Sequence, residues 1–523
     1  MEQQYDVIII GAGHNGLILG NYLAKGGRRV LILESRLEAG GGLSTEEVTV
    51  PGFWHNLHSY FHDTINIMPA YTEIGLENFD AKYYRPPVQA GVPLKDGRAL
   101  LMYDDIERTT RSIARFSERD ARTWRQIQDE YADFMQSVVV PAFYSPPPPP
   151  SQQVAVLEGS PEGLDYLRLS RMSPRDVVDE FFESDVVKAL VLHQLPIPRG
   201  MIDDYNGIGF VVPLIVSQIE HSQLCIGGSH ALAHALWRAY VRNGGEIQAF
   251  SHVTKILLDG GAAVGVETRA GDRYYAPVIA SSIDLKTTFL ALVGEEDIDA
   301  ELARKVRSFR LDEFSIFSVH MALNEAPRFK AAKFDPDVDR AFRLDIGFES
   351  PDDFSELWAD IRAGRLPRKP RLFASVPTVH DPSQAPPGKH TAFLWQLVPY
   401  DLKGMEWADV KREFMDRCVE AWREYAPNLN DRNIIMKVAM TPREIPAKIP
   451  NMVRGGVFMG RTLMDQIEYF RPLPELSQYR TPVPGLYLCG ASCHPGGGII
   501  GAAGFVAANV IADDTGMHKW WEA

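Results

Sequence analysis

The stretch YDVIIIGAGHNGLILGNYLAKGGRRVLILESRLEAGGG, residues 5–42, decides how the chain folds. Its segment Val7–Ile10 is a short run of β-branched residues, which is typical of a strand buried on both faces. A helix is predicted over His14–Lys25, because a pair of glycines that suits a helix C-terminus follows it. Val30–Leu33 is a second apolar strand. The order strand, helix, strand predicts a βαβ unit with a parallel sheet.

Three glycines and one acid in this stretch point to a ligand. Gly11, Gly13 and Gly16 form the pattern GxGxxG, which lets the chain turn sharply, approach a phosphate closely and pack the helix tightly on the strand. Glu34 ends the second strand, where a carboxylate can accept a hydrogen bond from a ribose hydroxyl. The alternative, a structural turn without a ligand, leaves the glycine spacing and Glu34 unexplained. The stretch therefore predicts a binding site for an ADP-containing dinucleotide.

The bulk properties of the chain narrow its class. A chain of 523 residues is too long for one ordinary core, so two or three domains are expected. The net charge of −14 and the lack of a basic block argue against nucleic acid as a partner. The longest uncharged apolar runs, 208–216 and 496–508, are too short to span a bilayer. Because the first strand begins at Val7, no room is left for a signal peptide, and we expect a cytoplasmic protein.

The cysteines argue against a metal site. Cys225, Cys418, Cys489 and Cys493 show no paired ligand spacing, since three residues separate the last two. Buried thiols in a reducing compartment are the simpler interpretation. No metal site is predicted.

Helices and strands are predicted along the rest of the chain. Ser173 and Pro174 suit the N-cap and first position of a helix over 173–191. The segment 205–216, YNGIGFVVPLIV, is predicted to be buried; a tunnel wall or a membrane-surface patch is the alternative. The proline tract 146–150 is predicted to be an extended surface loop. Further predictions are helices over 104–133, 229–242 and 407–425, alternating strands over 246–280, and strands over 315–323 and 391–398.

A second glycine-rich block closes the chain. The segment GLYLCGASCHPGGGIIGAAGFVAANVIAD, residues 485–513, predicts a strand, a glycine turn and a helix of small residues. Gly501 and Gly504 in that helix allow a close approach to another element. A helix N-terminus directly after Gly496–Gly498 would offer unpaired N–H groups to an electron-rich ligand.

Together, the two glycine-rich blocks resemble the phytoene desaturase-like flavoproteins, a family that includes carotenoid desaturases and belongs to the amine-oxidase-type superfamily. The subgroup that the chain resembles most is that of the homologues of pyridine nucleotide-disulfide oxidoreductase domain-containing protein 2. The likeness thins over 100–220 and 320–370. The segments that carry it are 5–16, 30–42, 51–60, 226–280, 380–390, 455–466 and 486–502.

The resemblance implies an α/β fold with a Rossmann-like FAD-binding domain of the amine-oxidase type and an interleaved α+β substrate domain. The FAD-binding domain would comprise residues 1–80, 222–310 and 450–523, and the substrate-binding domain residues 81–221 and 311–449. By the same resemblance, the residues that contact FAD are Gly11, Ala12, Gly13, Gly16, Glu34, Arg36, Gly41, Gly42, Val253, Gly490, Ala491, Gly501 and Ala502.

Candidates for acid–base catalysis are few, because in such a fold the flavin carries out the difficult step. His58, Tyr60 and His62 would share one face of an alternating strand that runs from the cofactor to the substrate. His494 lies beside the proposed flavin turn. A structural, hydrogen-bonded role is the alternative for each of them. Covalent flavin attachment or redox cycling at Cys489 and Cys493 is less favoured than an inert role.

The expected activity is removal of a hydride from a C–C or C–N bond of an apolar organic substrate, such as a carotenoid-like, isoprenoid or aromatic compound. The electrons would pass to O₂ or a quinone. A flavin-dependent saturase or isomerase and an amine oxidase are the enzymatic alternatives, and a non-catalytic lipid-escort protein is the alternative of another class. The absence of a CxxxxC pair near the first helix argues against a disulfide reductase. Peripheral membrane contact is a less favoured alternative, and an oligomer is left open.

Overall fold

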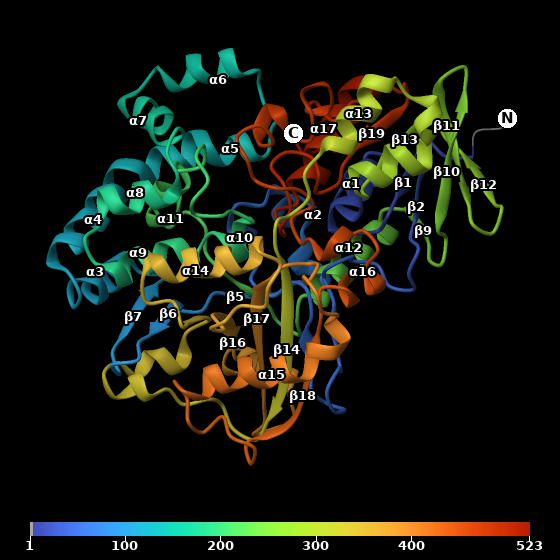
Figure 1. The fold of residues 1–523 in the computed structure, drawn as a ribbon. Helices are drawn as coiled ribbons and strands as arrows, with labels where there is room; N and C mark the ends of the chain where they lie inside the picture. Colours follow the sequence, from blue (N-terminus) through green and yellow to red (C-terminus); the bar gives the residue numbers. More distant parts are fainter. Residues whose placement is uncertain (1–3, 523) are drawn as a thin grey trace.

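The computed structural model describes residues 4–522 and contains two main sheets (Figure 1). The first is a five-stranded sheet in the order β19-β13-β1-β2-β9, and every neighbouring pair in it is parallel. Its central strands pair in register from Val7 with Val30 to Ile10 with Leu33, as the βαβ pattern predicts. Its strands are β1 Val7–Ile10, β2 Val30–Leu33, β9 Glu246–Gln248, β13 Val278–Ser281 and β19 Leu486–Leu488.

Three helices pack together beside the parallel sheet: α1 (His14–Lys25), α12 (His230–Arg242) and α17 (Ala502–Thr515). Helix α1 contacts both others, and a Cβ built on Gly504 of α17 would lie 2.3 Å from the Asn15 carbonyl oxygen. Only glycine allows so close an approach. The small-residue helix predicted at the end of the chain therefore packs directly on the helix of the first βαβ unit.

The predicted alternating strands over 246–280 divide between two sheets. The first and last of them, β9 and β13, join the parallel sheet. The three between them form an antiparallel sheet in the order β10-β11-β12, with bounds Val253–Asp259, Ala262–Thr268 and Arg273–Tyr275.

The second main sheet has seven strands in the order β18-β14-β17-β16-β15-β6-β7. Strands β14 and β17 pair antiparallel from Ser315 with Val398 to Leu323 with His390, and only β15 and β6 are parallel within this sheet as described. Its strands are β6 Val88–Pro93, β7 Ala99–Tyr103, β14 Ser315–Leu323, β15 Arg343–Ile346, β16 Leu372–Ser375, β17 His390–Val398 and β18 Ile434–Met440.

Both faces of the seven-stranded sheet are buried. Alternate residues of β14, such as Phe317 and Val319, share a hydrophobic core with helix α15 (Trp407–Arg423). On the opposite face, Phe393 and Trp395 of β17 share a core with a layer of helices, seen beside the sheet in Figure 1. These helices include α4 Glu118–Phe134, α7 Pro161–Leu169, α8 Pro174–Phe181, α9 Asp185–His193, α11 Val211–Val216 and α14 Pro351–Arg362.

The shorter elements connect these layers. The remaining helices are α2 Pro69–Ile74, α3 Ile106–Ala114, α5 Val140–Phe143, α6 Pro150–Leu157, α10 Pro196–Arg199, α13 Ala300–Ser308 and α16 Glu444–Lys448. The remaining strands are β3 Thr45–Glu46, β4 His55–Asn56, β5 Tyr83–Tyr84 and β8 Leu224–Cys225.

Three predicted elements differ in their bounds. The helix predicted over 104–133 is two helices, α3 and α4, because Ser117 caps the second by accepting the Asp120 N–H. The helix over 173–191 is also two, α8 and α9, although the predicted Ser173 cap and Pro174 are confirmed. The proline tract is not a pure surface loop, since Pro147 is buried and Pro150 begins α6.

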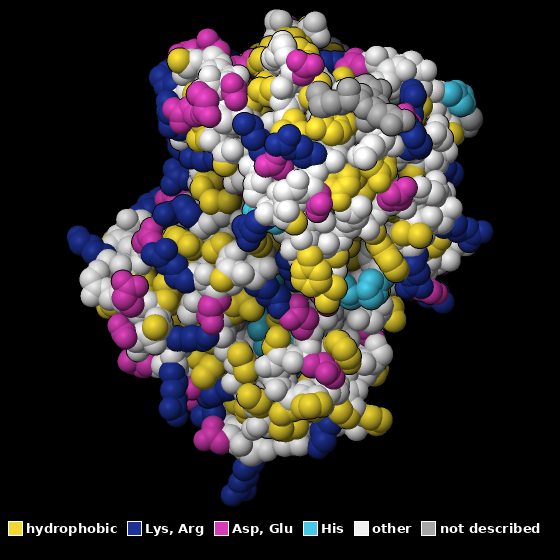
Figure 2. Space-filling model, turned by 90° about the vertical axis from the view of Figure 1, so that its right-hand side faces the viewer, with side chains coloured by type: hydrophobic (Ala, Val, Ile, Leu, Met, Phe, Trp, Pro, Cys, Tyr) yellow, Lys and Arg dark blue, Asp and Glu magenta, His cyan; other side chains and the backbone are white. Residues whose placement is uncertain are grey.

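The surface carries no single-sign field on the face drawn in Figure 2, where acidic, basic and hydrophobic side chains are interspersed. Among residues 4–522, none of the helices has both the length and the apolar character needed to cross a bilayer.

Candidate active site: a cavity between the two main sheets

One cavity of about 790 Å³ runs from the edge of the parallel sheet into the helical layer of the seven-stranded sheet. At one end it is lined by the glycine turn after β1 and by the segment that begins β10. At the other end it is lined by α5, α6, α7 and α11. The cavity therefore joins the two regions that the sequence assigns to cofactor and substrate.

The glycine turn after β1 forms the floor of the first end. Gly11 has a φ of +93°, and a Cβ on it would lie 2.8 Å from the Ser282 hydroxyl oxygen, so this position needs glycine. Gly13 lines the cavity and caps α1, and its Cβ position faces open space. A phosphate can therefore approach the backbone at the positive end of α1. This open cradle fits a dinucleotide.

Two predicted contact residues support the turn from behind instead of lining the cavity. Ala12 is fully buried, and its N–H donates to the Glu34 carboxylate. A Cβ on Gly16 would lie 2.2 Å from the Gly11 carbonyl oxygen, so the missing side chain lets α1 pack on the turn. Both residues shape the site without reaching it.

Glu34 is held in place at the end of β2. Its carboxylate accepts hydrogen bonds from the backbone N–H of Ala12 at 2.8 Å and of Arg36 at 2.9 Å, and the residue lines the cavity. Arg36, Gly41 and Gly42 also line it, and the Gly40 N–H bonds to the Ala12 carbonyl at 2.7 Å. The second glycine run is therefore tied to the first.

Val253 lies at the far side of this end, next to Ser251 and His252, which also line the cavity. The Ser251 N–H donates to the Glu34 carbonyl at 2.8 Å, so the start of β10 is fixed beside the end of β2. That the backbone at Val253 brackets the adenine stays a prediction.

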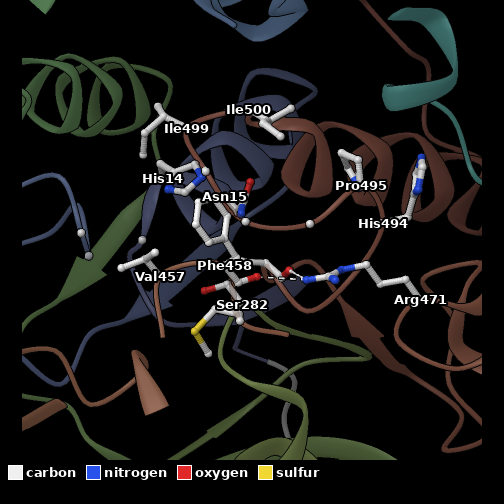
Figure 3. Close-up of a pocket in the computed structure, with 18 of the residues that line it drawn as sticks. His14, Asn15, Ser282, Val457, Phe458, Arg471, His494, Pro495, Ile499 and Ile500 are labelled. Carbon is white, nitrogen blue, oxygen red and sulfur yellow. Dashed lines mark hydrogen bonds between the residues drawn. The ribbon is translucent and has the colours of Figure 1, made fainter. Parts of the chain in front are cut away.

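The C-terminal glycine block lines the middle of the cavity (Figure 3). Ala491 and Gly496–Gly498 line it, together with Ile499 and Ile500. The helix N-terminus predicted directly after Gly498 is wrong, because α17 begins only at Ala502. Gly501 is the helix cap with a φ of 70°, which favours glycine.

Gly490, Gly501 and Ala502, which the resemblance places in contact with FAD, do not line the cavity. Gly490 packs against β13, since a Cβ on it would lie 2.8 Å from the Ser282 carbonyl oxygen. Gly501 packs against Ile18 and Met68. These residues hold the block in position, and the turn between them makes the surface.

Sequence reasoning missed Arg471, which is fully buried and lines the cavity beneath this turn. Its guanidinium donates to the carbonyls of Phe458 at 3.0 Å, Ala491 at 3.1 Å and Cys493 at 3.2 Å (Figure 3). The Asp312 carboxylate accepts the Phe458 and Gly460 N–H groups nearby. No motif marked this arginine, because its partners are backbone carbonyls 13 to 22 residues away, which any residue type can supply.

His494 lines the cavity, and one of its ring nitrogens is held by the backbone. Its Nε2 lies 2.9 Å from the Ala142 carbonyl oxygen, and its Nδ1 is buried without a partner among the described residues. Burial lowers the pKa of His494 to about 4, so the ring is neutral. The structural alternative fits His494 better than a catalytic role.

His58, Tyr60 and His62 do not share one face of a strand. Strand β4 covers only His55–Asn56, and the chain beyond it is irregular. His58 and Tyr60 line the cavity, but His62 does not. The two ring nitrogens of His62 meet the Tyr83 hydroxyl at 2.7 Å and the Ser59 hydroxyl at 3.0 Å, so His62 is a structural residue.

Burial keeps His58 and Tyr60, the two that line the cavity, uncharged. It lowers the pKa of His58 to about 3 and raises the pKa of Tyr60, so both are neutral near pH 7. The Tyr60 hydroxyl and His58 Nε2 are buried without partners in the described chain.

Cys489 and Cys493 are buried free thiols and do not line the cavity. Burial raises the pKa of Cys493 to about 12, and it raises that of Cys489 as well. A thiol that does not ionise is a poor nucleophile, which agrees with the predicted inert role. No group of three or more potential metal ligands occurs within the described part of the chain.

Beyond the glycine block, the cavity wall is mostly apolar. Phe210, Val211 and Leu214, from α11 and the residue before it, line it, with Leu157 of α6 and Trp395 of β17. The segment 205–216 is thus largely buried, as predicted, and part of it also forms the wall that was weighed as an alternative.

Known proteins match both the local turn and the whole chain. Residues 9–73 match the family model of the NAD(P)-binding Rossmann-like domain. A limonene dehydrogenase subunit from Castellaniella defragrans is 35% identical, over 99% of this chain and 96% of its own. The chain belongs to the phytoene desaturase-like family of FAD-dependent oxidoreductases.

A second relative and a solved structure are also similar to this phytoene desaturase-like chain over nearly its whole length. Pyridine nucleotide-disulfide oxidoreductase domain-containing protein 2 of Rattus norvegicus is 28% identical, over 98% of this chain and 94% of its own. A triple mutant of putrescine oxidase has a TM-score of 0.64 and 13% identity, covering 98% of this chain and 99% of that chain. The latter shows the amine-oxidase-type fold alone. Because the chain is an FAD-dependent enzyme, the escort alternative loses its support.

Proposed function

We propose that this FAD-dependent oxidoreductase dehydrogenates a small isoprenoid hydrocarbon, such as a cyclic monoterpene, and leaves a carbon–carbon double bond. The electrons then pass to O₂ or a quinone. The observation that carries the proposal is the apolar half of the cavity, which begins where the C-terminal glycine turn ends. Transfer of an apolar substrate from water to a cavity with an apolar wall is favourable, because it removes apolar surface from water.

The size of the cavity favours a small substrate over a carotenoid. Its whole volume is about 790 Å³, and this includes the glycine-lined half assigned to the cofactor. Pockets of about 300–1,000 Å³ typically hold molecules of drug size. The name of the limonene dehydrogenase relative, at 35% identity, supports the same class of substrate.

FAD supplies hydride acceptance when it is bound. We propose that Gly11, Gly13, Gly41 and Gly42 surround its pyrophosphate and that Glu34 accepts a ribose hydroxyl. Arg36 lies beside them, Val253 brackets the adenine, and Ala491 with the 496–498 turn borders the flavin. The regions 1–80, 222–310 and 450–523 would then form the FAD-binding domain, and 81–221 and 311–449 the substrate-binding domain.

The visible spectrum tests this function. We expect purified protein to be yellow, to bleach when limonene is added without oxygen, and to recover its colour in air or with a quinone. Bleaching by an amine but not by limonene would favour the amine oxidase alternative. Bleaching only by a nicotinamide donor would favour a saturase. A protein that cannot be loaded with FAD would refute the proposal.

A further inference from the structure

An ion pair stands in the wall of the otherwise apolar half of the cavity. Arg199 donates to the Glu220 carboxylate, and both residues line the cavity although their side chains are largely buried. Arg199 also donates to the Gln194 carbonyl at 2.7 Å. A buried pair of charges is costly, and it contributes little to stability unless its geometry is good. Because stability alone does not explain this ion pair in an apolar wall, we ask what it does for the reaction.

The pair lies next to the C-terminal glycine turn. The Pro198 carbonyl oxygen is 4.0 Å from the Cβ position of Gly498, and a Cβ on Gly200 would lie 2.5 Å from the Phe458 ring. The segment that carries Arg199 therefore packs on both walls of the middle of the cavity, where Phe458 is seen in Figure 3.

The segment that carries Glu220 is bound to the opposite side of the same region, since Asn66 donates to the Ile219 carbonyl at 2.8 Å. Asp63 also lines the cavity, and the next residue, Thr64, donates to the Ile499 carbonyl at 3.0 Å. Tyr144, whose pKa the Glu220 charge helps to raise, donates to the Ile500 carbonyl at 3.2 Å. The Glu220 carboxylate thus stands where the proposed flavin half meets the apolar half.

Four charged or titratable groups surround Glu220: Arg199, Asp63, Arg343 and Tyr144. One oxygen of the Asp63 carboxylate accepts both the Arg343 guanidinium at 2.9 Å and the Ser222 hydroxyl, so this acid is oriented by residues away from Arg199. In Glu220 one oxygen accepts from Arg199, and the other accepts no hydrogen bond from residues 4–522. Burial is the main cause that raises the pKa of Glu220; the Arg199 charge lowers this pKa, and the Asp63 charge raises it further. The net direction is upward, so the carboxylate can hold a proton.

We propose that Glu220 is the general base of this enzyme and that Arg199 holds its carboxylate toward the substrate. The proposal rests on the proposed function. One hydrogen leaves the substrate as a hydride, with both electrons of its C–H bond, to oxidised FAD. The hydrogen on the neighbouring carbon leaves as a proton to the free Glu220 oxygen. The electron pair of that second C–H bond becomes the new double bond.

The other acids and bases of the wall fit this role less well. One ring nitrogen of His494 is bound to the Ala142 carbonyl oxygen, and His62 does not line the cavity. Glu468 also lines the cavity, and burial raises its pKa, but its carboxylate accepts the Gln153 amide of α6 at 2.6 Å. Among residues 4–522 it has no ion-pair partner that would hold it, unlike Glu220.

The test compares Glu220→Gln with the wild-type holoenzyme by anaerobic stopped-flow, with limonene as the probe. The amide keeps the size of the side chain but cannot take a proton. We expect the rate of flavin bleaching to fall roughly 10²–10⁴-fold, the range for a lost general base. The wild-type rate should rise with pH through one ionisation, and the residual rate of the variant should not. Glu220→Asp should recover part of the rate and the pH dependence.

Glu313→Gln is the matched control. Glu313 is also a largely buried carboxylate that pairs with arginine, here Arg362 and Arg461, but it does not line the cavity. Its variant should keep the wild-type pH profile. An infrared titration of the FAD-free protein adds a readout that needs no turnover. The difference between the wild-type and Glu220→Gln spectra should contain one protonated-carboxyl band, because the other buried carboxyls, such as Asp345, contribute equally to both proteins.

The possible outcomes separate the assignment of Glu220 from the proposed function. A Glu220→Gln protein that loads FAD and bleaches at the wild-type rate with the same pH profile overturns the assignment, while the proposed function stands. If the wild type does not bleach with limonene, the proposed function and this inference both fall. If Glu313→Gln loses the same rate and pH dependence, the effect belongs to buried carboxylates in general and the assignment is overturned.

Discussion

The Ala12 N–H donates a hydrogen bond of 2.8 Å to the Glu34 carboxylate. This single contact links the turn after β1 to the end of β2, so the acid that should hold the ribose also fixes the backbone that should hold the pyrophosphate. The two halves of the nucleotide site are therefore coupled. A change at Glu34 is expected to affect both.

Replacing Glu34 with Ala should weaken FAD binding while the protein still folds. The loss removes a ribose acceptor and leaves the N–H groups of Ala12 and Arg36 without their partner, which costs about 1–3 kcal/mol in stability. Glu34→Gln keeps an acceptor oxygen and should bind FAD more tightly than the Ala variant. Titration with FAD by fluorescence measures both. If Glu34→Ala binds FAD as tightly as the wild type, the ribose assignment is wrong.

Two glycines of one motif should respond in opposite ways. Gly13→Ala places a methyl group in open space inside the cavity, so unfolding should change by about 1 kcal/mol or less while FAD binding weakens at least about tenfold. Gly16→Ala clashes with the Gly11 carbonyl and should lower the free energy of unfolding by about 1–3 kcal/mol or more. Thermal unfolding and FAD titration of the two variants give the comparison. Equal effects of both on FAD affinity and stability would contradict this division.

Arg471→Met should destabilise the fold, because the carbonyls of Phe458, Ala491 and Cys493 lose their donor inside the protein. We expect the free energy of unfolding to fall by about 3 kcal/mol in urea denaturation. Arg471→Lys keeps the charge but not the forked arrangement of N–H donors. Its free energy of unfolding should lie between those of the wild type and the Met variant. A Met variant as stable as the wild type would show that the guanidinium does not hold these loops.

The free energy of unfolding should decrease as the pH falls below about 6.5. Burial lowers the pKa of His14 and His494 to about 4 and of His58 and His62 to about 3. Between these values and about 6.5, the unfolded chain binds protons that the folded protein does not, so the free energy of unfolding falls as the pH falls. Above about pH 7 this contribution is fully present and constant.

Urea unfolding at a series of pH values measures that slope. His494→Gln, which can still donate to the Ala142 carbonyl, should reduce the slope between about pH 4 and 6.5 by up to one proton. His518→Gln is the control, because that side chain is exposed near the C-terminus. A wild-type stability that does not change between about pH 7 and 5 would contradict the neutral buried histidines.

The sequence by itself determined the parts of the molecule whose signal is local. Val7–Ile10, His14–Lys25 and Val30–Leu33 occur with the predicted bounds, since strand periodicity, glycine spacing and helix ends are set by neighbouring residues. The family resemblance rests on the same local blocks, and it led to FAD. The predicted strand 315–323 also has its predicted bounds, because its apolar residues are buried on both faces.

Only the tertiary structure decided which side chains reach the cavity. Gly16 and Ala12 belong to the predicted motif but lie behind the turn, and His62 is turned away toward Tyr83. Arg471 and the pair of Arg199 and Glu220 carry no motif, because their partners lie 13 to 22 residues away, across turns and loops with no regular spacing. Periodicity tells which face of a strand or helix is apolar, but whether a polar group meets a cavity or a backbone carbonyl depends on how the two sheets are placed. That placement comes from long-range packing, which no short stretch of sequence encodes.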